Sequence, residues 1–405
     1  MKIAIICSSF FPVIDGVTIA VFYRVKYLSQ LGHQVKLFCP DYSAIANIYP
    51  NWQDYTGEIF KGIEVISIPS TKSIALDFER DVAIGSYKIV SRELIKFQPD
   101  IIHVDEAERL GFCWLKLPGV KYARQHNIPC VAWFHTNYLE YFNDYFNLPF
   151  GLNYSIKKCL SFVFRRIYNS YDLTLAASTV TKQKLMAMKI DNVCQVELLG
   201  CDLERYNYSL RSNNFWTTQY NLPNIENQTK LIFIGRLTPD KGWNFTLNFL
   251  SQLNPKILNS IALIIVGDGP LKTEIERDLK QLTPDVYLLA RVPHQSIPAL
   301  LINSDILITN SQKETRGLTL IEAAAAGIPA IAPNAGGVTD TIDNGETGWL
   351  YRPQDSTEIN SKLEMLICDR DLRRSMGTKA KAKAQQWSWQ QTTNNLINIW
   401  MQEIS

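Results

Sequence analysis

Three successive patterns of apolar residues stand near the amino terminus: a continuous run, a stretch with helical spacing, and a second run. Residues 1–7 are almost wholly apolar and predict a buried strand. Thr18 can then cap a helix. Four apolar residues recur on one face of this helix: Val21, Val25, Leu28 and Leu31. Gly32 ends the helix, residues 34–40 predict the next strand, and the segment forms one βαβ unit.

Later apolar runs predict further buried strands, among them residues 173–177 and 305–309. The chain has 405 residues, 46% of them hydrophobic, which is enough for two cores of about 200 residues each. The polar, Asn-rich stretch 207–230 is the best candidate for the linker between them. Near the carboxyl terminus, Trp387 and Trp389 precede a final helical segment, and ordinary core packing is the simplest role for these tryptophans.

Composition excludes several classes of protein. The formal net charge of +2 and the lack of a helix-turn-helix or RNA-binding signature argue against nucleic acid as a partner. No apolar stretch approaches the length of about 18 residues that a membrane span needs, and residues 1–11 look like a strand rather than a signal peptide. The eight cysteines contain no C-x-x-C pair and no metal-ligand spacing. We therefore expect free thiols, no metal site and a cytoplasmic location.

Two glutamates flank the junction between the strand at 305–309 and an Ala-rich helix that starts near Gly317. Glu314 follows the strand, and Glu322 falls in the opening turns of the helix. A helix N-terminus offers free amides and a positive dipole end to an anion, whereas carboxylates accept hydrogen bonds from hydroxyl groups. We expect both acids to face one cleft that binds a nucleotide sugar. The alternative is a solvated loop acid and a favourable charge near a helix start.

Two cations follow another predicted strand that ends in Gly235. Arg236 and Lys241 stand five residues apart after the carboxyl end of this strand. A solvated loop explains one such cation, but a pair at this position suits a diphosphate. The Arg guanidinium can make two parallel hydrogen bonds to a phosphate, and the Lys ammonium supplies a compact positive charge. Together with the two glutamates, these cations favour a binding site over solvated surface charges.

The ordered motifs resemble those of retaining glycosyltransferases of family 4. In the carboxyl-terminal half they are 233–242, 266–270, 314–329, 334–337 and 344–350. In the amino-terminal half they are 10–17, 99–103, 128–136, Ser178 and 199–206. Each motif alone is weak, but the set covers nearly the whole chain. The resemblance implies an α/β fold of GT-B type with two Rossmann-like domains, a deep inter-domain cleft and a carboxyl-terminal helix that returns to the first domain.

The resemblance implies domains at residues 1–206 on the acceptor side, 207–385 for the nucleotide sugar, and 386–405 for the returning helix. It implies catalytic roles for His135, Arg236, Lys241 and Glu314. Donor-binding positions carried over from the family are Gly16, Gly235, Arg236, Lys241, Gly267, Val292, Glu314, Gly317, Leu318, Thr319 and Glu322. Glu314 would hold the sugar and Glu322 the ribose. His103 is assigned to structure.

The implied reaction retains the anomeric configuration, uses no enzyme nucleophile, and needs neither a metal nor a cofactor beyond the nucleoside diphosphate sugar, with a UDP-sugar favoured. The developing charge on the diphosphate would be stabilised by Arg236 and Lys241. A GT-B nucleotide-sugar epimerase is an alternative, but it should not carry both the Arg-Lys and the Glu-Glu pairs. A non-catalytic sugar-nucleotide binding protein would need Glu322 but not the two cations.

Positive charge is concentrated between residues 109 and 170. This stretch contains eight Lys or Arg, only two acidic residues and 15 aromatic residues. On the predicted helix 156–168 five apolar residues share one face: Ile156, Leu160, Val163, Phe164 and Ile167. The opposite face carries basic residues, and candidate membrane or acceptor contacts are Tyr138, Lys157, Lys158, Arg165 and Arg166. Such a surface is typical of proteins that touch an anionic bilayer. Core packing with a merely solvated basic face is equally compatible with the pattern.

Two motifs favour a lipid acceptor. Residues 135–141 resemble the His-Thr and downstream Tyr pattern of sulfoquinovosyldiacylglycerol synthases and related glycolipid mannosyltransferases, and residues 314–317 resemble their Glu-Thr-x-Gly version. Arg316 and Asn137 depart from that pattern. The expected partners are therefore a nucleotide sugar, a lipid acceptor and the cytoplasmic membrane face, to which the enzyme binds peripherally. A soluble or polysaccharide acceptor is the alternative.

Overall fold

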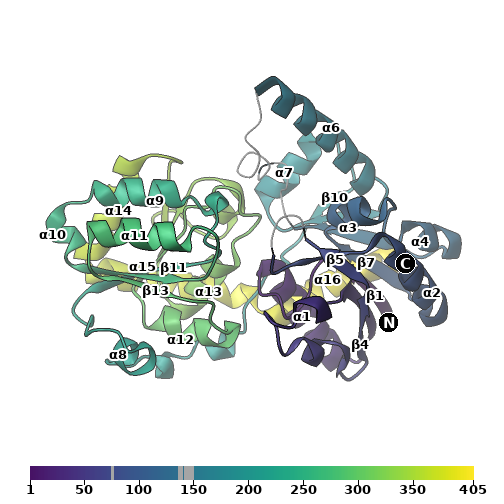
Figure 1. The fold of residues 1–405 in the computed structure, drawn as a ribbon, viewed down its shortest axis with the longest axis horizontal. Coiled ribbons are helices and arrows are strands. Elements are labelled where there is room, and N and C mark those ends of the chain that lie inside the picture. The colour runs from purple at the N-terminus through teal and green to yellow at the C-terminus, as the bar shows by residue number, and fades with distance from the viewer. Residues whose placement is uncertain (74–76, 136–139, 141–149) are drawn as a thin grey trace. The chain divides into compact units, whose positions relative to one another are not determined.

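The computed structural model describes residues 1–73, 77–135, 140 and 150–405. These residues form two compact units. The first comprises the described parts of 1–139 and 148–200 together with 389–405, and the second contains 201–388. Figure 1 shows a twisted sheet with helices in each unit. Both units are therefore α/β, as the sequence predicts.

The first unit is built on an eight-stranded sheet with the order β10-β9-β8-β7-β1-β2-β4-β3. All neighbouring strands are parallel except β3 and β4, which are antiparallel. The strands of the first unit, including the separate hairpin β5-β6, are β1 (Lys2–Cys7), β2 (Gln34–Pro40), β3 (Gly57–Phe60), β4 (Ile63–Ile68), β5 (Ser70–Lys72), β6 (Arg80–Val82), β7 (Ile101–Asp105), β8 (Cys130–Phe134), β9 (Leu173–Ala176) and β10 (Val193–Gln195).

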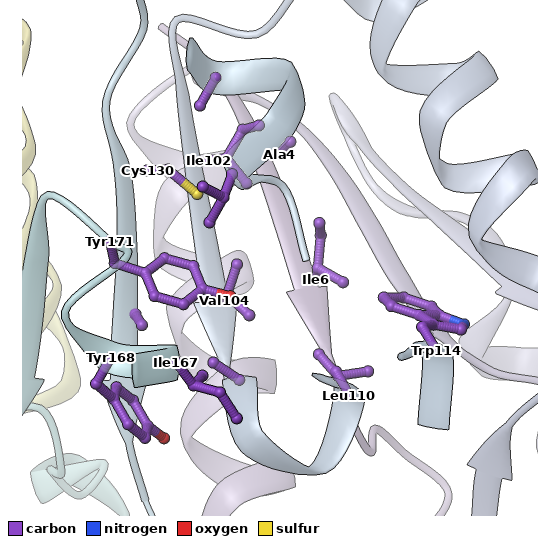
Figure 2. Close-up of a cluster of buried hydrophobic side chains, with 14 of the residues drawn as sticks. Ala4, Ile6, Ile102, Val104, Leu110, Trp114, Cys130, Ile167, Tyr168 and Tyr171 are labelled. Carbon is purple, nitrogen blue, oxygen red and sulfur yellow. The ribbon is translucent and has the colours of Figure 1, made fainter. Parts of the chain in front are cut away.

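The helices of this unit are α1 (Gly16–Gln30), α2 (Tyr87–Phe97), α3 (Ala107–Trp114), α4 (Val120–His126), α6 (Phe150–Tyr168), α7 (Thr179–Ala187) and α16 (Trp389–Ile404). Figure 2 shows the core on one face of the sheet, where Ala4 and Ile6 of β1 meet side chains of α3 and α6. Alternate residues of a strand point to opposite faces. The other face accordingly carries His103 of β7, whose ring meets Trp400 of α16 at a centroid distance of 5.4 Å.

Helix α16 packs on α1 of the first unit, although it follows the second unit in the chain. The rings of Tyr23 and Trp389 stack at 5.1 Å. Trp387, Trp389 and Trp400 are all buried, so their assignment to ordinary core is confirmed. The carboxyl-terminal helix therefore returns to the first unit, as expected for the GT-B fold.

The second unit contains a six-stranded parallel sheet with the order β13-β12-β11-β14-β15-β16. Its strands are β11 (Thr229–Ile234), β12 (Ile261–Val266), β13 (Val286–Leu289), β14 (Ile306–Ile308), β15 (Ala330–Pro333) and β16 (Gly348–Tyr351). Its helices are α8 (Phe215–Tyr220), α9 (Trp243–Ser251), α10 (Pro255–Leu258), α11 (Lys272–Leu282), α12 (Ile297–Ile302), α13 (Leu318–Ala326), α14 (Ser356–Cys368) and α15 (Arg370–Ala384). A continuous apolar core joins β11, β12 and β14 to α9, α11 and α14.

The polar stretch 207–230 is part of the second unit rather than a linker. It contains α8, in which Phe215 and Trp216 are buried. Trp216 donates its indole hydrogen to the carbonyl of Asn303 at 3.0 Å, and Asn303 in turn accepts from the amide of Ser212. The polar composition of this stretch suggests a linker, but the burial of Phe215 and Trp216 anchors it to the second unit.

Helix α1 begins earlier than predicted. Asp15, not Thr18, caps it: the carboxylate of Asp15 accepts from the amides of Val17 and Thr18, and the Thr18 hydroxyl accepts from the Asp15 amide. The two residues thus form a capping box with Asp15 at the N-cap and Thr18 three residues later, so the prediction that Thr18 is the cap is wrong. Val21, Val25 and Leu28 are buried as expected, whereas Leu31 lies beyond the helix and is 47% exposed.

Among the described residues, no helix combines the length and apolar character that crossing a membrane requires. All eight cysteines are free.

Candidate functional site

Glycines bring the loops after β11 and β12 together at the carboxyl edge of the second sheet. A Cβ on Gly267 would lie 1.9 Å from the carbonyl oxygen of Gly235, and one on Gly269 would lie 2.4 Å from that of Leu237. Both distances are far below van der Waals contact, so only glycine fits. The loop that carries Arg236 is therefore held by backbone packing at the edge where open α/β sheets bind ligands.

The loop that carries Glu314 is fixed in a similar way. The amide of Gly337 donates to the Glu314 carbonyl at 2.7 Å, and a Cβ on Gly337 would lie 1.9 Å from the carbonyl oxygen of Thr315. Gly317, with a φ of 85°, caps the start of α13. The first amides of this helix, at Leu318 and Thr319, have no carbonyl partner within the helix and can meet an anion.

Four charged side chains gather where these loops meet. Nζ of Lys241 lies 2.5 Å from Oε1 of Glu314. The carboxylate of Asp240 is fully buried and lies 3.6 Å from Arg236 and 3.9 Å from Lys241. Burial alone would raise the pKa of Glu314, but the adjacent Lys241 outweighs it and holds that pKa below its usual range. Glu314 is therefore ionised at neutral pH.

Glu322 lies on α13 and is almost completely buried. Its Oε1 is 2.7 Å from Nε2 of His294, which begins a short 3₁₀ turn after β13. Val292, another expected donor contact, is partly exposed two residues before His294. The structure thus places all the expected donor residues except Gly16 in the second unit, around the carboxyl edge of its sheet.

Gly16 belongs to the first unit and is the first residue of α1. A Cβ there would meet no atom within 4 Å, so packing within the protein does not require glycine at this position. Open space at Gly16 is compatible with the predicted approach of a ligand, and its role in donor binding stays a prediction.

His135 directly follows β8 in the first unit. Its Nε2 lies 2.7 Å from Oδ1 of Asp105, at the end of the neighbouring strand β7. Arg24 of α1 donates to both oxygens of Asp105, at 3.2 and 3.0 Å. Burial alone would raise the pKa of Asp105, but Arg24 and the two histidines hold it well below its usual range. Asp105 is therefore an anion that fixes the orientation of His135.

His103 also approaches Asp105, at 3.3 Å, but it is fully buried. Burial lowers its pKa to about 4, so His103 is neutral at physiological pH. Its position between α16 and Asp105 agrees with the structural role assigned to it. Close by, Ser8 bonds to Glu106, and Tyr168 bonds to Glu108.

The basic helix α6 divides into a buried and an exposed face. Phe164 and Ile167 pack in the core, while four residues spaced four apart are exposed: Tyr154, Lys158, Phe162 and Arg166. We call these four residues the α6 stripe. Residues at this spacing share one side of a helix. Lys157 and Arg165 are only partly exposed, and Tyr138 lies outside the described residues.

Several residues of these clusters escaped sequence analysis. Asp240 and His294 join the second-unit cluster, and Asp105 and Arg24 hold His135. Of these four residues, only Asp105 could have been found from the sequence, because it is an Asp at the carboxyl end of a buried strand. Within the parts of the chain that the structure describes, no group of three or more His, Cys, Asp or Glu side chains is arranged to hold a metal ion.

Two family models together match most of the chain. The model described as glycosyltransferase family 4 matches residues 14–205, and the one described as glycosyl transferases group 1 matches residues 215–383. The chain belongs to the GT-B glycosyltransferases. The resemblance stated from the sequence motifs is thereby confirmed.

Relatives of this GT-B glycosyltransferase include enzymes with different donors and products. It is 26% identical to sulfoquinovosyl transferase SQD2 of Arabidopsis thaliana, over 92% of this chain and 68% of the relative. A GDP-mannose-dependent alpha-mannosyltransferase of Mycolicibacterium smegmatis is 27% identical, with 86% and 84% covered. Alpha-monoglucosyldiacylglycerol synthase of Streptococcus pneumoniae is 25% identical, with 92% and 80% covered.

The fold also matches solved structures. Anabaena HepE, in complex with UDP and glucose, superposes with a TM-score of 0.74 at 18% identity, and the match covers 99% of this chain and 100% of HepE. At this identity the similarity establishes the fold alone. The two-unit architecture of this chain is that of a GT-B enzyme.

Proposed function

We propose that this GT-B glycosyltransferase transfers a hexose from a nucleoside diphosphate sugar, preferably a UDP-sugar, to a hydroxyl group of a membrane lipid, with retention of the anomeric configuration. The observation that carries the proposal is the cluster of Arg236, Lys241 and Glu314 at the edge of the second sheet, beside the N-terminus of α13. Cations and helix amides suit the diphosphate, and the carboxylate suits sugar hydroxyls.

Charge stabilisation is the main demand of such a reaction. The bond between the anomeric carbon and the diphosphate oxygen breaks, and the carbon gains oxocarbenium character while negative charge grows on the leaving group. Arg236 and Lys241 would stabilise that charge. The acceptor oxygen then bonds to the anomeric carbon on the face that the diphosphate leaves, and its proton passes to a phosphate oxygen. The steps balance without an enzyme nucleophile or a metal ion.

The acidic residues would position the donor. Glu314, ionised because Lys241 lowers its pKa, would accept hydrogen bonds from the sugar hydroxyls. Glu322 would accept from the ribose. His135, oriented by Asp105, would meet the sugar close to the β-phosphate. The donor base stays open to test, because some relatives are GDP-mannose-dependent by name.

The α6 stripe supports a membrane location for the acceptor. It presents an alternating series of aromatic and basic side chains to solvent, and the guanidinium of Arg166 lies 5.7 Å from the ring centroid of Phe162. Aromatic rings suit the interface of a bilayer, and cations suit its anionic head groups. A relative named as a glucosyldiacylglycerol synthase agrees with a lipid product. The protein would act on the cytoplasmic membrane face.

The test is a transfer assay with purified protein. UDP-glucose, UDP-galactose, UDP-sulfoquinovose and GDP-mannose are each incubated with diacylglycerol vesicles, with glycolipid vesicles, or with soluble saccharides, in the presence and absence of a chelator. We expect nucleoside diphosphate release that depends on lipid and withstands the chelator, together with an α-linked lipid product in mass and NMR spectra. A product formed on soluble saccharides alone would contradict the lipid acceptor, and an inverted linkage would contradict the mechanism.

A further inference from the structure

Glu322, the residue proposed to meet the ribose, forms a close pair with His294. The two residues are 28 positions apart, and their side chains meet at 2.7 Å between Oε1 and Nε2. Glu322 is 4% exposed and His294 is 16% exposed. The pair therefore lies inside the second unit, with the histidine nearer to solvent.

A buried carboxylate needs partners, because removal from water disfavours its charge. Within the described part of the chain, the contact with His294 is the hydrogen bond that Glu322 makes through its side chain. It engages Oε1 and leaves Oε2 for another donor. The rest of α13 around Glu322 is apolar: Leu320, Ile321 and the four following alanines are buried. The side-chain hydrogen bond to this carboxylate thus comes from outside the helix.

We propose that His294 is a positioning residue that holds the carboxylate of Glu322 in the orientation required by the ribose hydroxyls of the donor. A carboxylate can accept from two neighbouring hydroxyls, but only in a narrow range of side-chain rotations. Fixing Oε1 by Nε2 restricts those rotations before the donor arrives, so less conformational entropy is lost on binding. This inference rests on the proposed ribose role of Glu322.

The position of His294 in the chain agrees with this role. It begins the 3₁₀ turn His294–Ser296, which leads directly into α12, and α12 packs against α13. The imidazole therefore reaches Glu322 from a neighbouring element, not from the same helix. Gln is the suitable replacement, because its amide nitrogen lies at a reach similar to Nε2 and can donate to the same oxygen.

A purely structural role for His294 predicts a different result from a positioning role. If the imidazole only anchors its turn, its loss should affect every nucleotide alike. If it acts through Glu322, the loss should appear only when the ligand carries ribose hydroxyls. Nucleotides without those hydroxyls separate the two roles.

The experiment measures binding by calorimetry for the parent, His294→Ala, His294→Gln, Glu322→Gln and the double variant His294→Ala/Glu322→Gln. The probes are UDP and GDP, each compared with its 2′,3′-dideoxy form. For the diphosphate that the parent binds, we expect His294→Ala to weaken binding about tenfold, the scale of one hydrogen bond to a charged group. The dideoxy form should lose less than twofold, His294→Gln should remain within about threefold of the parent, and His294→Ala should add little to Glu322→Gln.

Equal losses for ribose and dideoxy nucleotides, or additive effects of the two substitutions, would overturn the positioning role while leaving the proposed function intact. If the parent binds neither diphosphate, or binds the dideoxy forms as tightly as the natural ones, the ribose role of Glu322 fails and the inference fails with it. If His294→Ala does not fold, His294→Gln still decides: weakening of the natural diphosphate beyond about threefold would overturn the role, because Gln can donate to the same oxygen of Glu322.

Discussion

Nζ of Lys241 lies 2.5 Å from Oε1 of Glu314, so the cation expected to meet the donor's diphosphate is paired with the acid expected to hold its sugar. The pair joins the loops after β11 and β14, which are 73 residues apart along the chain. Asp240 approaches Lys241 from the buried side. In the proposed reaction Lys241 exchanges its ion pair with Glu314 for one with the diphosphate. Glu314 is then free to accept hydrogen bonds from the sugar hydroxyls.

The diphosphate cations should be needed for turnover more than for folding. Arg236→Ala or Lys241→Ala should each lower kcat by about 10²-fold or more, the scale of losing one preorganised donor. Steady-state kinetics measures this, with exposed Lys256→Ala as the matched control. Near-normal turnover in both variants would remove these residues from the site. Lys241→Ala should also raise the pKa of Glu314, because it removes the main group that opposes the effect of burial on that pKa.

The two glutamates should differ in what they bind. Glu322→Ala should weaken binding of the free nucleoside diphosphate, whereas Glu314→Ala should weaken binding of the intact donor only. Calorimetry with both ligands separates the effects, each by about tenfold for a hydrogen bond to a charged group. Equal losses of both ligands in both variants would contradict the assigned roles.

Asp105→Asn should destabilise the first unit, because it leaves the buried Arg24 without a counter-charge. Removing one partner of a buried pair costs roughly 3–5 kcal/mol. The folded pKa of Asp105 is depressed, so its stabilisation is complete above the ordinary pKa of 3.8 and is lost as pH falls toward the folded value. Urea unfolding at pH 7 should therefore show the full difference, and the difference should shrink in acid. Exposed Asp191→Asn is the control, and an equal change in that variant would contradict the account.

Glu108 should make stability depend on pH in the opposite sense. Burial and the nearby Glu106 raise the pKa of Glu108 from 4.5 to about 8. The unfolded chain loses this proton first, so stability falls as pH rises from about 4.5 to about 8 and then levels off. Glu108→Gln keeps an oxygen for the Tyr168 hydroxyl and removes the titration. Its stability relative to the parent should rise between pH 5 and pH 8; a constant difference would show that Glu108 is ionised in the folded protein.

Reversing the charges on α6 should release the protein from anionic vesicles. Lys158 and Arg166 are the exposed cations of the α6 stripe, and each contributes up to about 1 kcal/mol near an anionic surface. We expect Lys158→Glu/Arg166→Glu to lose most of the binding, and adding Lys157→Glu/Arg165→Glu to abolish it, while donor hydrolysis persists. High salt should imitate the variants, since the Debye length is about 8 Å at physiological ionic strength.

Vesicle sedimentation at two salt concentrations measures this membrane binding. The matched control reverses two exposed cations of the second unit, Lys256 and Arg374. Equal sedimentation of the parent with anionic and neutral vesicles at low salt would favour a soluble acceptor.

Local patterns predicted the elements of the fold well. Residues 34–40 form a strand with the predicted bounds, because an apolar run follows a glycine that ends the preceding helix. The cap of α1 was assigned to Thr18 instead of Asp15, since both can accept from helix amides and spacing does not rank them. Residues 207–230 have the composition of a linker, and composition alone does not reveal that Trp216 in this polar stretch is buried.

The site was only partly predictable. Arg236, Lys241 and Glu314 follow strand ends, and their motifs identified them. Partners such as His294 for Glu322 depend on which elements lie side by side in the folded unit, and their separation of 28 residues leaves no local pattern. The same holds for Arg24 and Asp105, which are 81 residues apart.

The most direct test of the account follows a labelled hexose from its nucleoside diphosphate donor into lipid, with the parent protein and with Arg236→Ala/Lys241→Ala. The account predicts that label enters the lipid phase with the parent, with one nucleoside diphosphate released for each hexose transferred, and that the double variant transfers at most about one hundredth as fast. Undiminished transfer by the double variant, or no transfer by the parent from any of the UDP-sugars or GDP-mannose to any lipid, would contradict it.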